Sequence, residues 1–374
     1  MTIIINKMTK LFSFLIPTFL SLSLSAQMLE NTTYAAADSK IKVMGRHEIT
    51  ETRSVRFGSS GVTFFIRFEG KELKAVIRDE FKYGNSYNYF LVLVDGKIFR
   101  KFRTDSASTV YSLAENLSYK IHTAQLIKLT EGQNGWNELV SVDCESLLSA
   151  AEPPTSKIEF IGDSITCGFG DDDSGVPCGR GTWFDQHNAF TSYAIVSARN
   201  LKCQYMLSSV SGMGIHRNWN TPGPVMQDIY RGIYFDHADS LTRWNFQNYQ
   251  PDLITICLGT NDFSDGDQPQ PREKVDSVKF IQKYADFVKL VRQCNPKSKI
   301  LLLSSPMLDK ERNSRLVAYI GQVVKILNKE GESKIYTYAF KKRYIKGCNG
   351  HPNGKEQKQM ADELQGKLKS VLKV

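Results

Sequence analysis

The hydrophobic pattern of the chain changes at the paired prolines Pro153 and Pro154. Between residues 41 and 144, apolar and polar side chains alternate with a period of two, which is typical of half-buried antiparallel strands. Beyond the prolines, short apolar runs alternate with segments whose hydrophobic residues recur every three or four positions, a pattern that predicts helices covering a parallel sheet. Paired prolines fit neither a helix interior nor a central strand, so the sequence predicts a boundary at residues 152–155.

The region before this boundary is predicted to be an all-β sandwich domain of roughly 100 residues, at positions 41–150. Its clearest strands are expected at 62–68, 73–77, 87–94 and 119–129. Asp95-Gly96 separates two of the alternating segments and predicts a tight hairpin, because both residues tolerate the positive φ that such a turn needs.

The region after the boundary, at positions 155–374, is predicted to be a three-layer α/β domain. Apolar runs at 158–161, 203–210, 253–258, 300–304 and 334–339 are expected to form the strands of a parallel sheet. Segments 273–294, 311–329 and 354–372 carry hydrophobic residues along one helical face and are expected to form covering helices.

The first 26 residues have the features of a secretory signal peptide. Lys7 and Lys10 precede an apolar run at 11–20, and small residues lead to a first-choice cleavage site after Ala26, with 35–37 as a later alternative. The run is interrupted by Pro17 and is too short to favour a membrane anchor. The sequence therefore predicts an exported protein, periplasmic or extracellular, that is soluble once the peptide is removed.

The formal net charge is +9 over 374 residues, which by itself could suggest a nucleic-acid partner. Lys and Arg are spread along the chain, however, and no basic block with interleaved aromatics stands out. A solvated, mildly basic surface is the favoured interpretation, so no nucleic-acid partner is expected.

Seven cysteines is an odd number, so at least one must be free or must pair between chains. Export permits disulfides, and Cys167 with Cys178 is the predicted pair because both flank one loop. The alternative is buried, unpaired thiols, which the apolar surroundings of Cys203 and Cys257 favour. No cysteine and histidine spacing resembles a metal site.

Ser164 is the candidate nucleophile. The apolar run 158–161 ends abruptly at Gly162-Asp163-Ser164, which places the serine past the carboxyl end of a parallel strand, where ligands collect in open α/β sheets. Gly-Asp-Ser is also ordinary turn chemistry, so the motif needs partners elsewhere in the chain before it indicates catalysis.

Three such partners lie in comparable places. Gly212 and Asn261 follow later strands and could donate N–H groups to an oxyanion, and His351 lies in a loop before the last helix, where it could act as base. Each could be a turn or surface residue if taken singly. Their order along the chain and their places at strand ends favour one catalytic site.

The sequence resembles the SGNH (GDSL-type) hydrolases in four blocks: Gly162-Asp163-Ser164, Gly212, residues 259–262 (GTND) and His351-Pro352. The β-sandwich ahead of the hydrolase, IGDSITCGFG at 161–170, Trp244 shortly before Pro251 and the stretch 122–131 resemble carbohydrate esterase family 2. The resemblance covers about 43–372. It implies a flavodoxin-like, three-layer SGNH domain preceded by a jelly-roll or sandwich domain.

The resemblance also implies an activity. It points to a cofactor-free serine esterase that deacetylates plant polysaccharides such as xylan and glucomannan, with Ser164 and His351 as catalytic residues. Ser164, Gly212 and Asn261 would form the oxyanion hole. The expected partner is an acetylated polysaccharide or oligosaccharide bound by a monomer, without metal, nucleic acid or membrane.

The sequence departs from the family pattern just before the histidine. Many SGNH enzymes have an aspartate three residues before it, and this family often has one two residues before it, but Cys348 and Asn349 stand at those positions. A Ser–His dyad is therefore predicted, with Asn349 Oδ1 or a main-chain oxygen accepting from the imidazole.

Substrate contacts are less constrained. Trp183, Trp219, Trp244 and Tyr230 lie between strands and could stack on sugar rings, and Trp183 and Trp244 are the first choices. Two other functions stay open: a lipid or thioester hydrolase, and a glycan-binding protein whose esterase site has decayed. Whether the sandwich itself binds glycan is also open.

Overall fold

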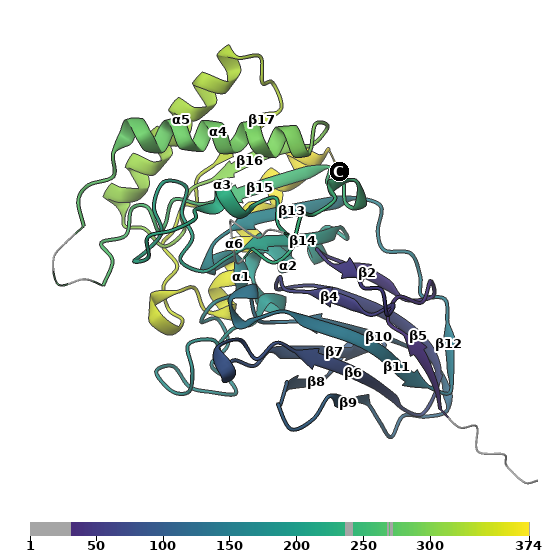
Figure 1. The fold of residues 1–374 in the computed structure, drawn as a ribbon. Coiled ribbons are helices and arrows are strands. Elements are labelled where there is room, and N and C mark those ends of the chain that lie inside the picture. The colour runs from purple at the N-terminus through teal and green to yellow at the C-terminus, as the bar shows by residue number, and fades with distance from the viewer. Residues whose placement is uncertain (1–30, 236–241, 268, 270–271, 374) are drawn as a thin grey trace, which may run out of the picture. The chain divides into compact units, whose positions relative to one another are not determined.

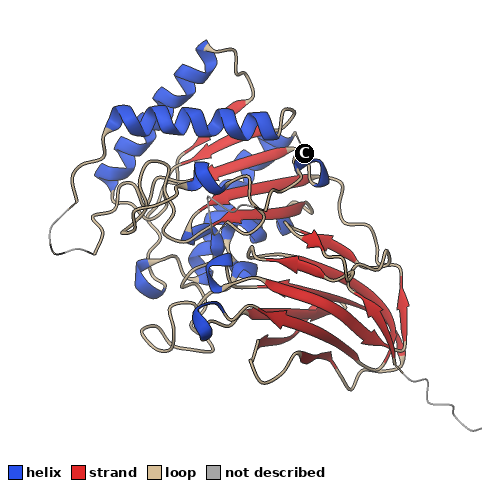
Figure 2. Cartoon of the chain, viewed as in Figure 1, coloured by secondary structure: helices blue, strands red, loops and turns tan. Residues whose placement is uncertain are grey.

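Two antiparallel sheets face each other in the amino-terminal region of the computed structural model (Figures 1 and 2). The structure describes residues 31–235, 242–267, 269 and 272–373, so the predicted signal peptide lies outside the described residues. One sheet has the order β3-β4-β11-β6-β9, with β1 also paired to β11. Its strands are β1 (Thr32–Ala35), β3 (Glu48–Ile49), β4 (Val55–Phe57), β6 (Leu73–Asp79), β9 (Val110–Ala114) and β11 (Asn137–Cys144).

The second sheet has the order β12-β5-β10-β7-β8, with β2 also paired to β5. Its strands are β2 (Lys42–Met44), β5 (Thr63–Gly70), β7 (Tyr89–Val94), β8 (Lys97–Arg103), β10 (Lys120–Lys128) and β12 (Ser146–Leu148). The predicted hairpin is present: Val94 pairs with Lys97, and the intervening Asp95 and Gly96 both have positive φ, at 50° and 77°. Phe64, Ile66 and Phe68 of β5 point into the core, as the period of two predicted.

The second region contains a five-stranded parallel sheet with the order β14-β13-β15-β16-β17. Its strands are β13 (Lys157–Gly162), β14 (Gln204–Ser209), β15 (Leu253–Cys257), β16 (Lys299–Leu303) and β17 (Ile335–Tyr338). Numbered along the chain this order is 2-1-3-4-5, which is that of flavodoxin-like folds. The predicted β-sandwich followed by a three-layer α/β region is therefore confirmed.

Helices cover both faces of the parallel sheet (Figure 2). Strand residues Ile254 and Leu302 pack toward α4 (Ser277–Cys294) and α5 (Lys310–Lys329), whereas Leu253 and Leu301 pack toward α2 (Tyr193–Asn200) and α6 (Gly354–Leu372). Two single-turn helices, α1 (Ser164–Cys167) and α3 (Met226–Ile229), lie in loops.

Capping side chains set where the long helices begin. Asp276 accepts hydrogen bonds from the main-chain N–H groups of Val278 and Lys279, so α4 starts at Ser277 rather than at the predicted residue 273. Val278, one of the hydrophobic residues of the segment predicted as a helix, is 75% exposed. Helix α6 has the predicted bounds because Asn353 and Glu356 form a reciprocal capping box at its start.

A buried ion pair joins the sandwich to the parallel sheet. Arg46, which follows β2, donates from Nη2 to Glu159 Oε1 of β13 at 3.0 Å, and neither side chain is exposed. Arg46 Nη1 also donates to the main-chain oxygens of Tyr230 and Gly232 at 2.5 and 2.8 Å, while Glu159 accepts from Ser208 and Tyr230. Residues 31–374 form one compact unit.

Among the residues described here, no helix combines the length and the apolar character that crossing a membrane would require.

Replacing Glu159 by Ala is expected to lower the free energy of unfolding by about 3–5 kcal/mol, because it leaves the Arg46 guanidinium buried without its counter-ion. Urea denaturation followed by circular dichroism measures this loss. Glu152→Ala is the matched control, since Glu152 pairs with Lys42 on the surface and its removal should leave the midpoint unchanged. Equal midpoints for the two variants would contradict the role given to the buried pair.

Candidate active site

Ser164 lies just past the carboxyl end of β13 and begins helix α1. Gly162 permits this exit, because a Cβ there would lie 2.1 Å from Thr166 Oγ1. Asp163 caps the helix, its side chain accepting from the main-chain N–H of Ile165 at 3.1 Å. The serine therefore lies at the carboxyl end of β13, one of the two strands, β13 and β15, between which the strand order reverses and where open α/β sheets bind ligands.

His351 completes a pair with this serine. Its Nε2 lies 2.9 Å from Ser164 Oγ, and its Nδ1 lies 3.2 Å from the main-chain oxygen of Asn349. The main-chain acceptor is one of the two that the sequence left open, and the left-handed backbone of Asn349, at φ 53°, turns that oxygen toward the ring. Nδ1–H thus donates to Asn349, which leaves Nε2 to accept from the Ser164 hydroxyl.

Burial keeps this imidazole neutral. Desolvation lowers the pKa of His351 to about 4, and the Phe169 ring covers it at a centroid distance of 4.3 Å. A neutral imidazole hydrogen-bonded to a serine hydroxyl can act as a general base over a wide pH range.

Two main-chain N–H groups, those of Ser164 and Gly212, are predicted to serve an oxyanion hole. Ser164 is the first residue of α1, so its N–H has no acceptor within the helix. Gly212 has φ 75°, and its carbonyl accepts from Trp219 N–H at 2.8 Å. Within the described residues, neither Ser164 N–H nor Gly212 N–H makes a hydrogen bond. The structure therefore leaves both groups free to bind an anion.

Asn261 joins the two loops that carry these donors. Its Nδ2 donates to the main-chain oxygen of Met213 at 2.8 Å and to Asp163 Oδ2 at 3.2 Å. Met213 follows Gly212, and Asp163 precedes Ser164. Asn261, predicted to serve an oxyanion hole, thus lies between these two loops, and both of its amide hydrogens already have acceptors.

The two residues predicted as the first-choice sugar contacts differ in exposure. Trp183 is 42% exposed and stacks on Phe169, the ring that covers His351. Trp244 is only 5% exposed and packs with Met206 and Tyr249. The prediction that it contacts sugar is therefore wrong, and Trp244 is a core residue. Its place in a loop gave no sign of this burial.

The other two aromatic candidates also differ. Trp219 is 40% exposed, and its main-chain N–H donates to the main-chain oxygen of Gly212. Tyr230, in contrast, is buried, and its hydroxyl donates to Glu159. Of the four candidates, Trp183 and Trp219 are therefore the exposed ones, Trp183 beside the ring that covers His351 and Trp219 beside Gly212.

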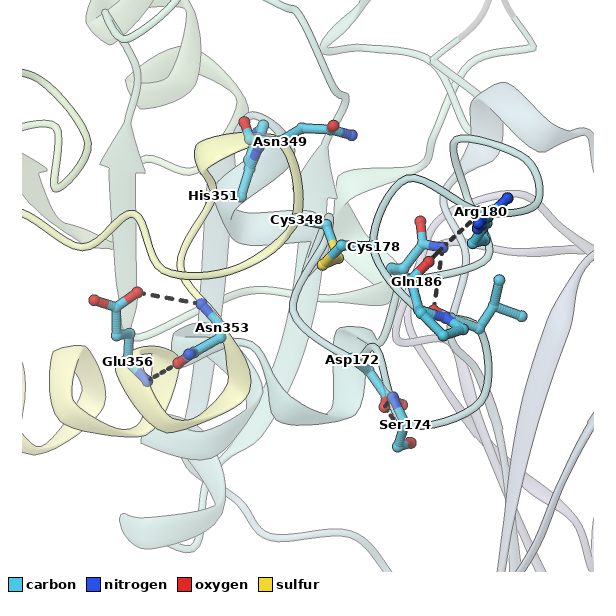
Figure 3. Close-up of a disulfide and its surroundings, with 12 residues drawn as sticks. Asp172, Ser174, Cys178, Arg180, Gln186, Cys348, Asn349, His351, Asn353 and Glu356 are labelled. Atoms are coloured by element: carbon cyan, nitrogen blue, oxygen red, sulfur yellow. Dashed lines mark hydrogen bonds between the residues drawn. A yellow bond between two sulfur atoms is a disulfide. The ribbon is translucent and has the colours of Figure 1, made fainter.

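The disulfide differs from the predicted one. Cys178 pairs with Cys348, 170 residues later in the chain (Figure 3). Cys167 is a buried free thiol. Cys167 cannot reach Cys178 because α1 turns its Sγ inward, 3.2 Å from Ser209 Oγ. The alternative, buried unpaired thiols at Cys203 and Cys257, is confirmed.

The disulfide ties two loops at the site together. Cys348, bonded to Cys178, directly precedes Asn349, whose main-chain oxygen accepts from His351 (Figure 3). Cys178 itself lies in a loop, five residues before Trp183 in the chain. Gln186 folds that loop by donating to three of its carbonyl oxygens. Loop closure across 170 residues has no local sequence signal, so only the three-dimensional structure could reveal it.

Two other residues at the site were not predicted from the sequence. Phe169 covers His351, and the Glu131 carboxylate of the sandwich binds the loop before Gly212. The stretch 122–131, which contains Glu131, was singled out only because it resembles the family, and no role was predicted for Glu131.

Among the described residues no cluster of histidine, cysteine or carboxylate side chains could hold a metal ion. The arrangement of nucleophile, base and free N–H groups suits acyl transfer.

Two family models match the sequence. One, described as carbohydrate esterase 2 N-terminal, matches residues 43–154, and the GDSL-like lipase/acylhydrolase family matches residues 160–340. The chain is 28% identical over 360 residues to an acetylxylan esterase / glucomannan deacetylase of Cellvibrio japonicus, covering 95% of this chain and 96% of that protein. It is 30% identical over 336 residues to the cellulase/esterase CelE of Acetivibrio thermocellus, covering 88% of this chain and 39% of that longer protein.

Solved structures show the same likeness. A family two carbohydrate esterase from Cellvibrio japonicus superposes with a TM-score of 0.82 at 27% identity, covering 92% of this chain and 98% of that one. Another, from Clostridium thermocellum in complex with cellohexaose, gives a TM-score of 0.80 at 29% identity and covers 89% and 99%.

Removing the disulfide with Cys178→Ser is expected to lower the free energy of unfolding by about 3–5 kcal/mol, because the bond constrains a long loop of the unfolded chain. Urea denaturation measures the change. Dithiothreitol should shift the natural chain to the midpoint of the variant and leave the variant unchanged. A thiol titration of the denatured, unreduced chain should find the five free cysteines, and seven would contradict the disulfide.

Proposed function

This chain belongs to carbohydrate esterase family 2, and on that premise we propose that it is an exported acetylesterase acting on plant polysaccharides such as xylan and glucomannan. The observation that carries the proposal is the 2.9 Å contact between Ser164 Oγ and His351 Nε2. It pairs a nucleophile with a base at the ligand-binding edge of a parallel sheet.

In the proposed first step, His351 Nε2 takes the hydroxyl proton of Ser164 while Oγ attacks the acetyl carbonyl carbon. The carbonyl oxygen becomes an oxyanion, and we assign its stabilisation to the N–H groups of Ser164 and Gly212 and to Asn261 Nδ2. One such donor contributes roughly 3–4 kcal/mol to the transition state. Burial raises the pKa of nearby Asp163 to about 7, which reduces the negative charge beside the forming oxyanion.

In the second step, the His351 imidazolium gives its proton to the sugar oxygen as the carbon–oxygen bond breaks. The sugar hydroxyl leaves and the acetyl group stays on Ser164 Oγ. Water then attacks the acyl carbon, with its proton taken by Nε2, and acetate is released as the serine recovers its proton.

A Ser–His dyad, rather than a triad, is part of the proposal. The main-chain oxygen of Asn349 fixes the tautomer by accepting from Nδ1–H, which is the orienting role that an aspartate has in a triad. This acceptor carries no formal charge, so it gives the imidazolium less electrostatic support than a carboxylate would.

A polysaccharide substrate is supported by the surroundings of the dyad. Trp183 lies beside Phe169, and Trp219 is anchored at Gly212, so exposed indole rings stand near the base and near the oxyanion site. Aromatic faces of this kind stack on sugar rings. The relative of known structure that was solved with cellohexaose is consistent with a glycan ligand.

Export is proposed from the basic and apolar start of the chain together with the Cys178–Cys348 bond. Disulfides of this kind persist in oxidising compartments and are rare in the cytosol.

Ser164→Ala is expected to abolish acetate release, by at least about 10³-fold, because the acyl acceptor is lost. The measurement is acetate release from acetylated xylan, acetylated glucomannan and an aryl acetate, with the natural chain and the variant in parallel. The ranking of the two polysaccharides identifies the substrate.

The same assay separates the rival functions. A preference for long acyl chains over acetate would indicate a lipid or thioester hydrolase. Glycan binding without acetate release from the natural chain would indicate a binding protein and would overturn the esterase proposal.

The pH profile of kcat/KM should reflect the low pKa of His351. Burial lowers this pKa to about 4, so the ring stays neutral as the pH is lowered from roughly 7 to 5. Activity on an aryl acetate should then fall through about pH 4, because protonated Nε2 cannot accept the Ser164 proton. Circular dichroism at each pH confirms that the chain is folded, and a midpoint near 6.5, the ordinary histidine value, would contradict this prediction.

A further inference from the structure

The loop that carries Gly212 is held by side chains of the β-sandwich. Glu131, three residues past the end of β10, accepts from the main-chain N–H of Ser211 on Oε2 at 2.7 Å and from the Ser211 hydroxyl on Oε1. Gln133 Nε2 donates to the main-chain oxygen of Ser211 at 2.7 Å. Every polar group of the residue before Gly212 is therefore bonded to the sandwich.

The same carboxylate also reaches the helix that begins with the nucleophile. Cys167, the last residue of α1, has its Sγ 3.6 Å from Glu131 Oε2 and 3.2 Å from Ser209 Oγ. One carboxylate consequently contacts the residue that precedes Gly212 and the helix that starts at Ser164. These two loops supply the main-chain donors of the proposed oxyanion hole.

Glu131 is itself firmly placed. It is fully buried, and Lys128 Nζ, also buried, donates to the main-chain oxygens of Thr130 and Glu131 at 2.7 and 3.2 Å. Burying a carboxylate is costly unless its oxygens are hydrogen-bonded. Ser211 in an exposed loop could hydrogen-bond to water and would not need a buried carboxylate. The two hydrogen bonds from Ser211 to Glu131 therefore indicate that Glu131 holds this turn in one conformation.

We propose that Glu131 is a positioning residue, which fixes the Ser211–Gly212 turn so that Gly212 N–H and Ser164 N–H point at the same oxygen. This inference rests on the esterase function proposed above. Gly212, at φ 75°, stands in a backbone region that other residues rarely adopt, so its N–H direction is set by the turn. The sandwich thereby contributes to the chemistry without touching the reacting atoms.

Four variants test this. Glu131→Ala removes both contacts to Ser211. Glu131→Gln keeps an oxygen for Ser211 N–H, and its amide can donate to the Ser211 hydroxyl, so the turn should be rescued. Ser211→Ala removes only the hydroxyl contact. Glu138→Ala is the matched control, because Glu138 is a buried sandwich glutamate that accepts from Ser54 and Arg56 within the sandwich.

Two readouts are combined on the full chain. The first is kcat and KM for an aryl acetate, together with the inhibition constant of phenylboronic acid, whose tetrahedral serine adduct needs the oxyanion donors. The second is amide hydrogen exchange of residues 210–213, which does not depend on activity. Loss of one oxyanion donor predicts a fall of about 100-fold in kcat for Glu131→Ala, with KM changed by less than about threefold.

The proposal is supported if Glu131→Ala shows this fall, weaker boronate inhibition and faster exchange at 210–213, while Glu131→Gln retains most of kcat and Glu138→Ala all of it. It is overturned if exchange at 210–213 is unchanged in Glu131→Ala, or if Glu138→Ala loses as much kcat. Should Glu131→Ala not fold, Ser211→Ala decides: about a tenfold lower kcat supports the proposal and natural kcat overturns it.

Failure of the esterase proposal is recognised separately. In that case the natural chain releases no acetate that depends on Ser164, and hydrogen exchange alone then decides whether Glu131 holds the turn.

Discussion

The guanidinium of Arg46 and the carboxylate of Glu159 are both buried where the sandwich meets the parallel sheet. Two desolvated charges are tolerated there because Tyr230 and Gly232 carbonyls accept from the arginine and hydroxyls of Ser208 and Tyr230 donate to the glutamate. Glu159 belongs to β13, the strand that ends at the turn carrying Ser164. The attachment of the sandwich and the placement of Ser164 therefore depend on the same strand, and the sandwich is then close enough for its Glu131 to reach the active-site loops.

Local patterns predicted most of the architecture, because periodicity, caps and turns act over a few residues. Helix α6 has the predicted bounds, since Asn353 and Glu356 close its start, and the turn at Asp95-Gly96 follows from backbone preferences. Ser164 and His351 were predicted and do lie together. Trp244 was wrongly assigned and Cys348 was not recognised as a disulfide partner, because burial and contacts between distant segments are set by tertiary packing.

The base of the proposed dyad works without a charged partner. Its acceptor is a main-chain oxygen, so no side-chain substitution at Asn349 can delete it, and only a change of backbone can move it. Burial lowers the pKa of His351 because it makes the protonated, charged form of the ring less favourable. Stabilisation of the transition state then falls more heavily on the oxyanion donors than it would in a triad, which makes the rigidity of the Gly212 turn correspondingly more important.

The Cys178–Cys348 bond also bears on which cysteines of the chain can pair. Cys167 stands eleven residues from Cys178, whereas Cys348 is 170 residues away, so loop-closure entropy in the unfolded chain favours the short, wrong ring. In the folded chain, α1 holds Cys167 in the interior beside Ser209, so Cys178 can pair only with Cys348 of the histidine loop. The native pairing is thus the one that the folded structure permits, rather than the one favoured by proximity along the chain.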